Sequence, residues 1–169
     1  MLFVENIGIK DFSPFGVKGE RIFSKKEKEE VYNPMVANKD FVDWMTVKKT
    51  LNAREIPSPF FEREVWWASL GENIGFELDG KSPDYSRPII ILKIFSENNL
   101  FYAPLTTMKC CRKRPFFFDV GEIVPGKRSR ASLSHTSSMD GRRLLKKIGM
   151  LEESTFLDLK EAVRLYIFS

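Results

Sequence analysis

Two hydrophobic segments separated by a long polar loop constrain the fold of this chain more than any other feature. Glu64–Leu70 and Ile89–Phe95 are rich in β-branched and aromatic residues, which favours strands. The loop between them, Gly71–Pro88, holds three glycines and mostly polar side chains. A long polar loop on a small sheet is typical of a binding loop. Arg87 ends this loop at the start of a strand, so the sheet fixes its backbone while its guanidinium can bind an anion.

The composition indicates a globular protein with a substantial core. The 169 residues favour one domain, or one domain with an appendage, and 15 of them are Phe. No apolar run approaches the ~20 residues needed to cross a bilayer, and the first residues lack the pattern of a signal peptide. We therefore expect a cytoplasmic protein without membrane contact. The adjacent Cys110 and Cys111 are expected to be reduced, because neighbouring cysteines rarely reach disulfide geometry.

The chain divides into three parts by pattern. Residues 1–38 show no clear period and are expected to form a flexible extension. Residues 39–58 hold an amphipathic helix followed by a linker with two prolines. Phe41, Trp44, Met45, Lys48 and Leu51 recur near helical spacing, and we interpret this stripe as packing rather than a cofactor site. Residues 59–169 form the main domain.

The main domain is predicted to be rich in strands. Beyond the first two, the sequence predicts strands over 100–106, 116–120 and 130–136, and short strands at this spacing favour a compact barrel or a strongly bent sheet. Two helices are predicted at the end. Asp140 is the expected cap of the first, which would run through 142–148, and Ser154 is the expected cap of the second. Phe156, Leu159, Val163 and Ile167 would form the apolar face of that second helix. The expected fold class is mainly β (α+β).

Basic side chains are concentrated in two short segments. Residues 108–115 and 126–130 hold seven basic residues and no acidic one, in a chain whose net charge is +4. Loops of this kind suit a polyanion, with solvated turns as the alternative interpretation. We favour contact with nucleic acid. The seven residues are Lys109, Arg112, Lys113, Arg114, Lys127, Arg128 and Arg130.

The sequence lacks most motifs of metal and nucleotide chemistry. It holds one histidine, His135, and has no HExxH, no CxxC and no glycine-rich phosphate motif. We therefore expect no metal and no cofactor. The polar groups left near predicted strand ends are Glu77, Arg87, Thr106, Thr107, Ser134 and His135.

This set suits cleavage of RNA without a metal. The 2′-hydroxyl is an internal nucleophile, so the protein has to move protons and stabilise a phosphorane. Arg87 would stabilise charge, Thr106 would position a phosphate oxygen, and His135 or Glu77 would transfer a proton. Each residue also has a plain structural interpretation. Thr106 could simply end a strand, Glu77 could be a surface charge, and His135 could be structural.

Six short motifs, in the same order along the chain, resemble those of the MazF/PemK toxins of type II toxin–antitoxin systems. They span about residues 60–169, and no single one is specific by itself. The motifs are Val65-Trp66-Trp67 with Leu70-Gly71, Gly75-Phe76-Glu77, Arg87-Pro88-Ile89-Ile90-Ile91-Leu92, Pro104-Leu105-Thr106-Thr107, Ser132-Leu133-Ser134-His135, and Asp140 with Arg143-Leu144 and Ile148-Gly149.

The resemblance implies an SH3-like barrel of the CcdB/MazF type, with a C-terminal helix and, in this chain, an N-terminal helical extension. It implies a homodimer that cleaves single-stranded RNA at specific sequences and leaves a 2′,3′-cyclic phosphate. A cognate antitoxin, through whose complex DNA can also be bound, would be the protein partner. Arg87 and Thr106 match the family's catalytic arginine and threonine, and the glycine and glutamate of its first loop match Gly75 and Glu77. The RNA-binding surface is then expected to include Gly75, Lys81, Thr107, Ser134 and the seven basic residues above.

The chain also departs from the family pattern. Lys81–Tyr85 is an extra segment before Arg87, and it is our candidate for what sets the base preference. His135 stands where many relatives have glutamine, and serines stand where some carry arginine or aspartate. We hypothesise that His135 takes over proton transfer, because a pKa near ~6.5 suits both an acid and a base.

Two other functions fit the same barrel. A CcdB-like toxin would bind DNA gyrase without a nuclease site, although such a protein does not need an arginine directed into a groove. A degenerate barrel would bind RNA without cleaving it, which is consistent with Ser132 and Ser134 at the expected catalytic positions. The cleavage sequence, set by loop shape and base stacking, does not follow from these motifs.

Overall fold

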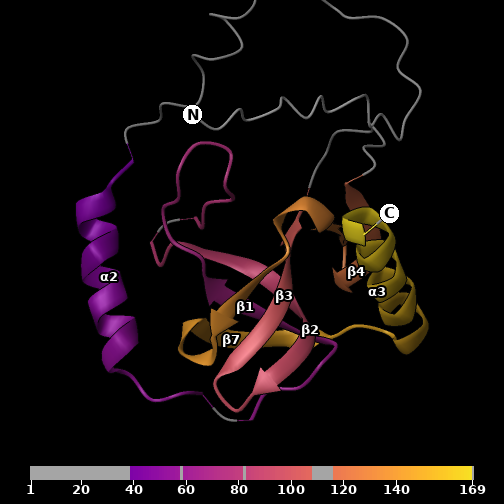
Figure 1. Cartoon of the computed structure of the whole chain (residues 1–169), viewed down its shortest axis with the longest axis horizontal. Helices are drawn as coiled ribbons and strands as arrows, with labels where there is room; N and C mark the ends of the chain where they lie inside the picture. The colour runs from indigo at the N-terminus through magenta and orange to yellow at the C-terminus, as the bar shows by residue number, and fades with distance from the viewer. Residues whose placement is uncertain (1–38, 58, 82, 108–115, 169) are drawn as a thin grey trace, which may run out of the picture. The chain divides into compact units, whose positions relative to one another are not determined.

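A curled antiparallel sheet forms the centre of the computed structural model, which describes residues 39–57, 59–81, 83–107 and 116–168 (Figure 1). Within these residues the strand order is β4-β5-β3-β2-β1-β7, and β6 pairs with β3. The strands are β1 (Glu64–Ser69), β2 (Ser86–Ser96), β3 (Asn99–Thr106), β4 (Phe117–Val124), β5 (Lys127–Ser132), β6 (Ser137–Asp140) and β7 (Leu144–Met150). The mainly β fold predicted from the sequence is confirmed.

Strand β2 lies in the middle of the sheet and is buried on both faces. Ile89, Ile90 and Ile91 are fully buried, and successive side chains of a strand point to opposite faces. Ile90 belongs to one hydrophobic cluster, while Ile89 and Ile91 belong to another. This double burial explains why the segment reads as a continuous hydrophobic run rather than an alternating one.

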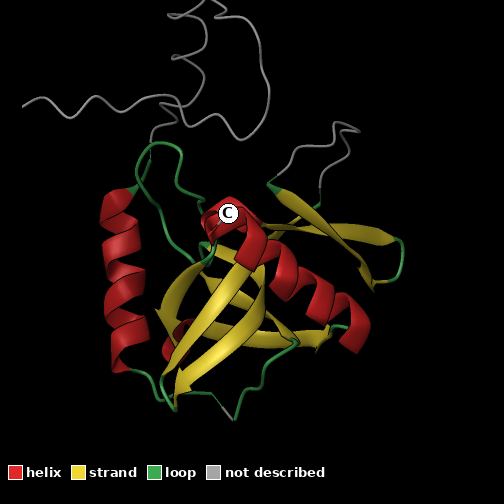
Figure 2. Cartoon of the chain, turned by 45° about the vertical axis from the view of Figure 1, so that its right-hand side comes forward, coloured by secondary structure: helices red, strands yellow, loops and turns green. Residues whose placement is uncertain are grey.

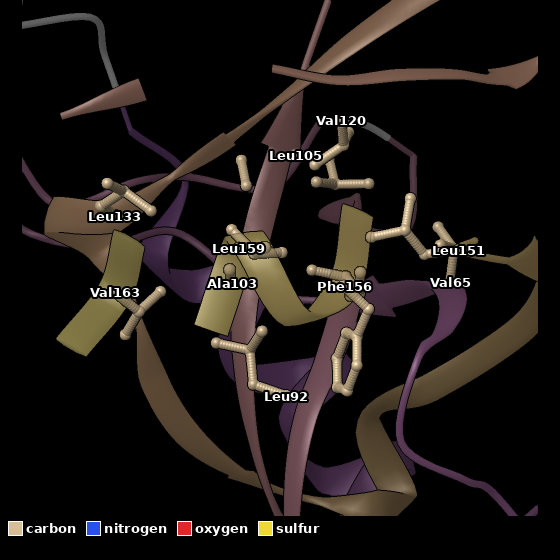
Figure 3. Packing of buried hydrophobic residues seen from close by; sticks show 12 residues of the cluster. Val65, Leu92, Ala103, Leu105, Val120, Leu133, Leu151, Phe156, Leu159 and Val163 are labelled. Atoms are coloured by element: carbon tan, nitrogen blue, oxygen red, sulfur yellow. The ribbon is translucent and has the colours of Figure 1, made fainter. Parts of the chain in front are cut away.

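Helix α3 (Glu153–Phe168) covers one face of the sheet (Figure 2). Phe156, Leu159 and Val163 point from the helix into the cluster that contains Leu92 and Ala103 (Figure 3). The helix does not begin as expected. The carboxylate of Glu152, and not Ser154, caps it, accepting the backbone N–H of Ser154 at 2.7 Å. Ile167 is exposed rather than part of the apolar face.

Helix α2 (Phe41–Ala53) is the helix predicted before the main domain. Asp40 caps it by accepting the backbone N–H of Asp43 at 2.8 Å. Trp44 and Leu51 are buried, whereas Phe41 and Met45 of the predicted stripe are about half exposed. The described residues of both helices lie in one compact unit, residues 38–169. Within the described residues no helix has the length and apolar character needed to cross a membrane.

The predicted helix over 142–148 is wrong. Gly141–Arg143 form one 3-10 turn, and Leu144–Met150 then form β7, which pairs with β1. Asp140 does cap, but it caps this short turn by accepting the backbone N–H of Arg142 at 2.8 Å. The apolar residues of β7 fit helical spacing in the sequence, yet pairing with the free edge of β1 decides the conformation.

The predicted strand over 130–136 is also wrong in its limits. β5 begins at Lys127, so part of the second basic segment is strand rather than loop. It ends at Ser132, and Leu133–His135 form a 3-10 turn before β6. β4 extends four residues further than expected, to Val124, which gives a tight β4–β5 hairpin around Pro125 and Gly126.

Candidate functional site

A pocket opens where β2 begins, β3 ends and the β4–β5 hairpin curls over them. Its polar lining includes Lys81, Arg87, Thr106, Thr107, Lys127 and Arg128. Its apolar lining includes Trp67 of β1, Ile123 of β4 and Ile148 of β7. Residues of β4 and β7, the two ends of the sheet, therefore meet at this site because the sheet is curled. We call this hollow the Arg87 pocket.

Arg87 of β2 and Thr106 of β3 line the same pocket. Ile89 of β2 pairs with Pro104 of β3, and Arg87 and Thr106 each lie two residues beyond this pair on their own strand. On its other side Arg87 pairs with Ala68 of β1. A cation and a hydroxyl thus project from neighbouring strands into one hollow.

The guanidinium of Arg87 makes one hydrogen bond to the described part of the protein, through Nε. Its Nε donates to the backbone oxygen of Asp79 at 2.9 Å. Within the described residues its two Nη atoms make no hydrogen bond. Burial lowers the pKa of Arg87, while the charge of Asp79 opposes that shift. An arginine stays protonated in either case, so a half-buried cation with free donors faces the pocket.

The β4–β5 hairpin adds positive charge at the edge of the pocket. Lys127 and Arg128 are exposed there, and Arg128 forms an ion pair with Asp119 at 2.8 Å. Burial raises the pKa of Asp119, but a bond from Gly121 N–H and the charges of Arg128 and Arg130 outweigh it and leave that pKa lowered. Arg130 pairs with Thr106 in the β3–β5 ladder, so it is near the pocket without lining it.

Two predicted residues of the loop after β1 have structural partners instead of lining the pocket. The Glu77 carboxylate accepts a hydrogen bond from the backbone N–H of Ile74 at 3.0 Å. The backbone N–H of Glu77 donates to the backbone oxygen of Ile74 at 3.1 Å. Gly75 lies at the tip of this turn with φ +58°. Lys81 of the extra segment does line the pocket, where it forms a β-bridge with Ser86.

His135 joins the 3-10 turn after β5 to the same loop. Its Nε2 donates to the backbone oxygen of Phe76 at 3.1 Å. Its Nδ1 lies 2.8 Å from Ser132 Oγ and 3.0 Å from Ser134 Oγ, so a serine hydroxyl donates to it in the neutral ring. Both nitrogens are engaged, and the ring is not among the groups that line the Arg87 pocket.

The structure therefore brings some of the predicted site residues together and separates others. Arg87, Thr106, Thr107, Lys81, Lys127 and Arg128 share one pocket. Gly75, Glu77, Ser134 and His135 lie at the neighbouring loop and turn. The predicted residues Lys109, Arg112, Lys113 and Arg114 lie outside the described residues.

Asp79 is a contact of Arg87 that the sequence did not reveal. Its backbone oxygen holds Arg87, and its carboxylate accepts the N–H of Asn73 at 2.7 Å. A single acidic residue in a polar loop carries no motif. Trp67, by contrast, belongs to the Trp66-Trp67 pair that the sequence showed; Trp66 is buried, and Trp67 lines the pocket.

Comparison with known proteins decides the family. A family model described as "PemK-like, MazF-like toxin of type II toxin-antitoxin system" matches residues 62–167. The chain belongs to this toxin family. Members of the MazF/PemK family are known endoribonucleases. No protein with curated function matches the chain.

A solved MazF structure shares the fold. MazF from Deinococcus radiodurans superposes with a TM-score of 0.51 at 14% identity, covering 69% of this chain and 100% of that one. The Mycobacterium tuberculosis toxin MazF-mt6 is 24% identical over 61% of this chain and 94% of its own, with a TM-score of 0.46. A mycobacterial endoribonuclease in complex with its cognate antitoxin is 14% identical over 63% and 93% of the two chains, with a TM-score of 0.48.

Proposed function

We propose that this MazF/PemK protein is a toxin that cleaves single-stranded RNA at specific sequences without a metal ion. The observation that supports this most is that Arg87 and Thr106, from the neighbouring strands β2 and β3, line one pocket with Lys127 and Arg128. Among the described residues no group of three His, Cys, Asp or Glu side chains is placed to hold a metal.

The 2′-hydroxyl next to the cleaved bond attacks the phosphorus in this mechanism. The P–O5′ bond breaks, which leaves a 2′,3′-cyclic phosphate on one fragment and a 5′-hydroxyl on the other. The proton of the 2′-hydroxyl goes to a base, and the leaving 5′-oxygen gains a proton from an acid. The Nη donors of Arg87 can bind the phosphorane oxygens, whose negative charge grows as the transition state forms. The Thr106 hydroxyl can fix the orientation of the phosphate.

The proton-transfer group is the open part of this mechanism. His135 remains our candidate for it, with Glu77 as the other. For His135 to act, its Nε2 has to exchange the Phe76 carbonyl for the RNA, which requires the loop after β1 to shift when RNA binds.

The ends of the cleaved RNA and the need for a 2′-hydroxyl test this proposal. Purified protein should cut single-stranded RNA in EDTA, and mass spectrometry of the fragments should show 2′,3′-cyclic phosphate and 5′-hydroxyl ends. The same RNA with a 2′-deoxy nucleotide before the cleaved bond should be bound but left intact. Cleavage of the deoxy substrate, or a need for added divalent metal, would contradict the mechanism.

One observation favours a second candidate, a barrel that binds RNA without cleaving it. The titratable groups that line the described part of the Arg87 pocket are cations, while His135 and Glu77 have structural partners elsewhere. Binding of RNA with no new ends in the assay above would support this function. A CcdB-like toxin would instead inhibit gyrase supercoiling, and no observation of this structure favours it.

The partners follow from the same proposal. We propose a cytoplasmic homodimer that is held inactive by a cognate antitoxin with an acidic, flexible segment. Such a segment would compete with RNA for Arg87 and for the positive edge formed by Lys127 and Arg128. The solved complex of a mycobacterial endoribonuclease with its cognate antitoxin is consistent with a partner of this kind.

A further inference from the structure

We propose that α2, with the adjacent Lys39, fixes the Gly71–Gly80 loop and through it the guanidinium of Arg87. Helix α2 precedes the region matched by the family model, residues 62–167. Yet α2 runs beside the loop after β1 (Figure 1), and its Trp44 and Asp43 contact Gly71 and Tyr85. Lys39, Asp43 and Trp44 would thus be positioning residues. Their catalytic consequence rests on the proposed function above, whereas their effect on the loop does not.

Lys39 is linked to Arg87 through a single residue, Asp79. The Lys39 ammonium lies 2.8 Å from one carboxylate oxygen of Asp79 and 3.0 Å from the other, and it also donates to Asn73 O. The Lys39 side chain is only 13% exposed, which strengthens the pairing. The carboxylate of Asp79 closes the loop by accepting Asn73 N–H, and its backbone oxygen accepts Arg87 Nε–H at 2.9 Å.

Trp44 packs directly on the backbone where the loop begins. Gly71 has φ +98°, and a Cβ at this position would lie 2.3 Å from the Trp44 ring. A glycine is therefore required for the helix to approach this closely. The Arg143 guanidinium lies 5.6 Å from the same ring and donates to the backbone oxygens of Ser69 and Leu70 at 3.1 and 3.0 Å. The start of the loop is thus held from both sides.

Tyr85 holds the end of the loop against α2. Its hydroxyl donates to Asp43 at 2.8 Å, and its ring centroid lies 5.5 Å from that of Trp44. Its φ is +47°, a strained value for a residue with a Cβ, and such strain persists only where several contacts impose it. Its backbone oxygen accepts the N–H groups of Leu70 and Gly71 at 2.9 and 3.1 Å, which brings the two ends of the loop together.

These contacts make the loop rigid before any ligand binds. An arginine whose Nε is already fixed loses less freedom when its Nη atoms meet a phosphate, so α2 would preorganise the catalytic cation. Without Lys39 or the Tyr85 hydroxyl, Asp79 and the backbone around it gain freedom. Arg87 then samples orientations that do not face the pocket.

Two variants of the full chain test this inference. Lys39→Met removes the ion pair with Asp79, and Tyr85→Phe removes only the hydroxyl bond to Asp43 while keeping the ring. Lys49→Met, an exposed lysine of the same helix, is the matched control, and Lys39→Arg should restore the pairing. Near-UV circular dichroism would show that each variant keeps the wild-type fold.

The main readouts do not depend on activity. Amide hydrogen exchange over residues 73–80 and exchange of the Arg87 Nε–H by NMR should both speed up about tenfold in Lys39→Met, and less in Tyr85→Phe. The single-turnover cleavage rate at saturating RNA should fall about ten- to a hundredfold in Lys39→Met, and Lys49→Met should match wild type in every measurement.

The possible results separate the two proposals. Unchanged exchange in both variants would overturn the role of α2, whatever the activity. Faster exchange with an unchanged cleavage rate would show that the loop does not position Arg87 for catalysis, and this also overturns the inference. If wild type cleaves no RNA, the proposed function fails, and the exchange of the Arg87 Nε–H still decides whether α2 fixes that side chain.

Discussion

At the scale of single residues, the proposed site centres on the Arg87 guanidinium and the Thr106 hydroxyl, with further cations at the pocket edge. Arg87 and Thr106 line one pocket because β2 and β3 pair two residues further along, at Ile89 and Pro104, so the main chain of the sheet brings them together. Their arrangement could be predicted once both strands were recognised. The position of His135 could not, because its 3-10 turn directs the ring toward the loop rather than along a strand.

His135→Gln separates proton transfer from loop positioning. An amide can still donate to the Phe76 carbonyl, so we expect loop amide exchange to stay near wild type. If the imidazole transfers the proton, the single-turnover rate should fall by about 10²–10⁴, and the pH dependence of cleavage that the imidazole imposes should disappear. A full cleavage rate with an unchanged pH profile would rule out this role.

At the scale of elements, an ion pair between the buried Glu64 and the half-exposed Lys147 joins β1 to β7. Glu64 is 2% exposed, and its carboxylate accepts bonds from Lys147, from the Trp66 indole at 2.9 Å and from Phe61 N–H at 3.0 Å. Burial raises the pKa of Glu64, but these bonds, led by Lys147, outweigh it and leave the pKa below its ordinary 4.5. The ionised form is thus stabilised by folding.

Because the pKa of Glu64 is lowered by folding, the free energy of unfolding should decrease in acid. The ionised Glu64 stabilises the fold above pH 4.5, and this stabilisation is lost as the pH falls through the lower pKa of the folded protein. The free energy of unfolding of Glu64→Gln should therefore fall less steeply with acid than that of wild type. Lys147→Met leaves the buried carboxylate without its cation and should lower the free energy of unfolding by about 1–3 kcal/mol at pH 7. The loss is smaller than for a fully buried ion pair because the Lys147 side chain is half exposed. Urea titrations across the pH range measure both effects.

The loop after β1 offers a matched pair of glycines. A Cβ on Gly80 would lie 1.6 Å from the backbone oxygen of Tyr85, whereas a Cβ on Gly75 would meet open space. Gly80→Ala should therefore lower the free energy of unfolding by about 2 kcal/mol or more by forcing the loop ends apart. Gly75→Ala, strained only by its positive φ, should cost about 1 kcal/mol. Equal costs in denaturant titrations would contradict the close approach at Gly80.

At the scale of the whole molecule, the sequence revealed the sheet more readily than its edges. The hydrophobic runs of β1, β2 and β3 are long and uniform, so they read as strands without context. β7 was predicted as helix because Leu144, Leu145 and Ile148 match helical spacing, and only the free edge of β1 makes it a strand. The link from Lys39 to Asp79 spans 40 residues and follows no local pattern, so it needed the structure.

Charge around the Arg87 pocket should make RNA binding depend on salt. Lys127 and Arg128 are exposed at its edge, where each can replace counterions on a phosphate. The logarithm of the association constant for single-stranded RNA should fall linearly with that of the salt concentration, and Lys127→Gln should reduce the slope by roughly 0.7. Lys160→Gln, on α3 and away from the pocket, is the control. An unchanged slope in Lys127→Gln would remove this residue from the RNA surface.

The cleavage rate of Arg87→Ala tests the central claim most directly. We expect the single-turnover rate at saturating RNA in EDTA to fall about 10²–10³-fold, because the phosphorane loses its main positive partner. Arg164→Ala, an exposed arginine paired with Glu161 on α3, should cleave at the wild-type rate. Wild-type cleavage by Arg87→Ala, in a protein that is folded and binds the 2′-deoxy RNA, would show that the Arg87 pocket is not where the reaction occurs.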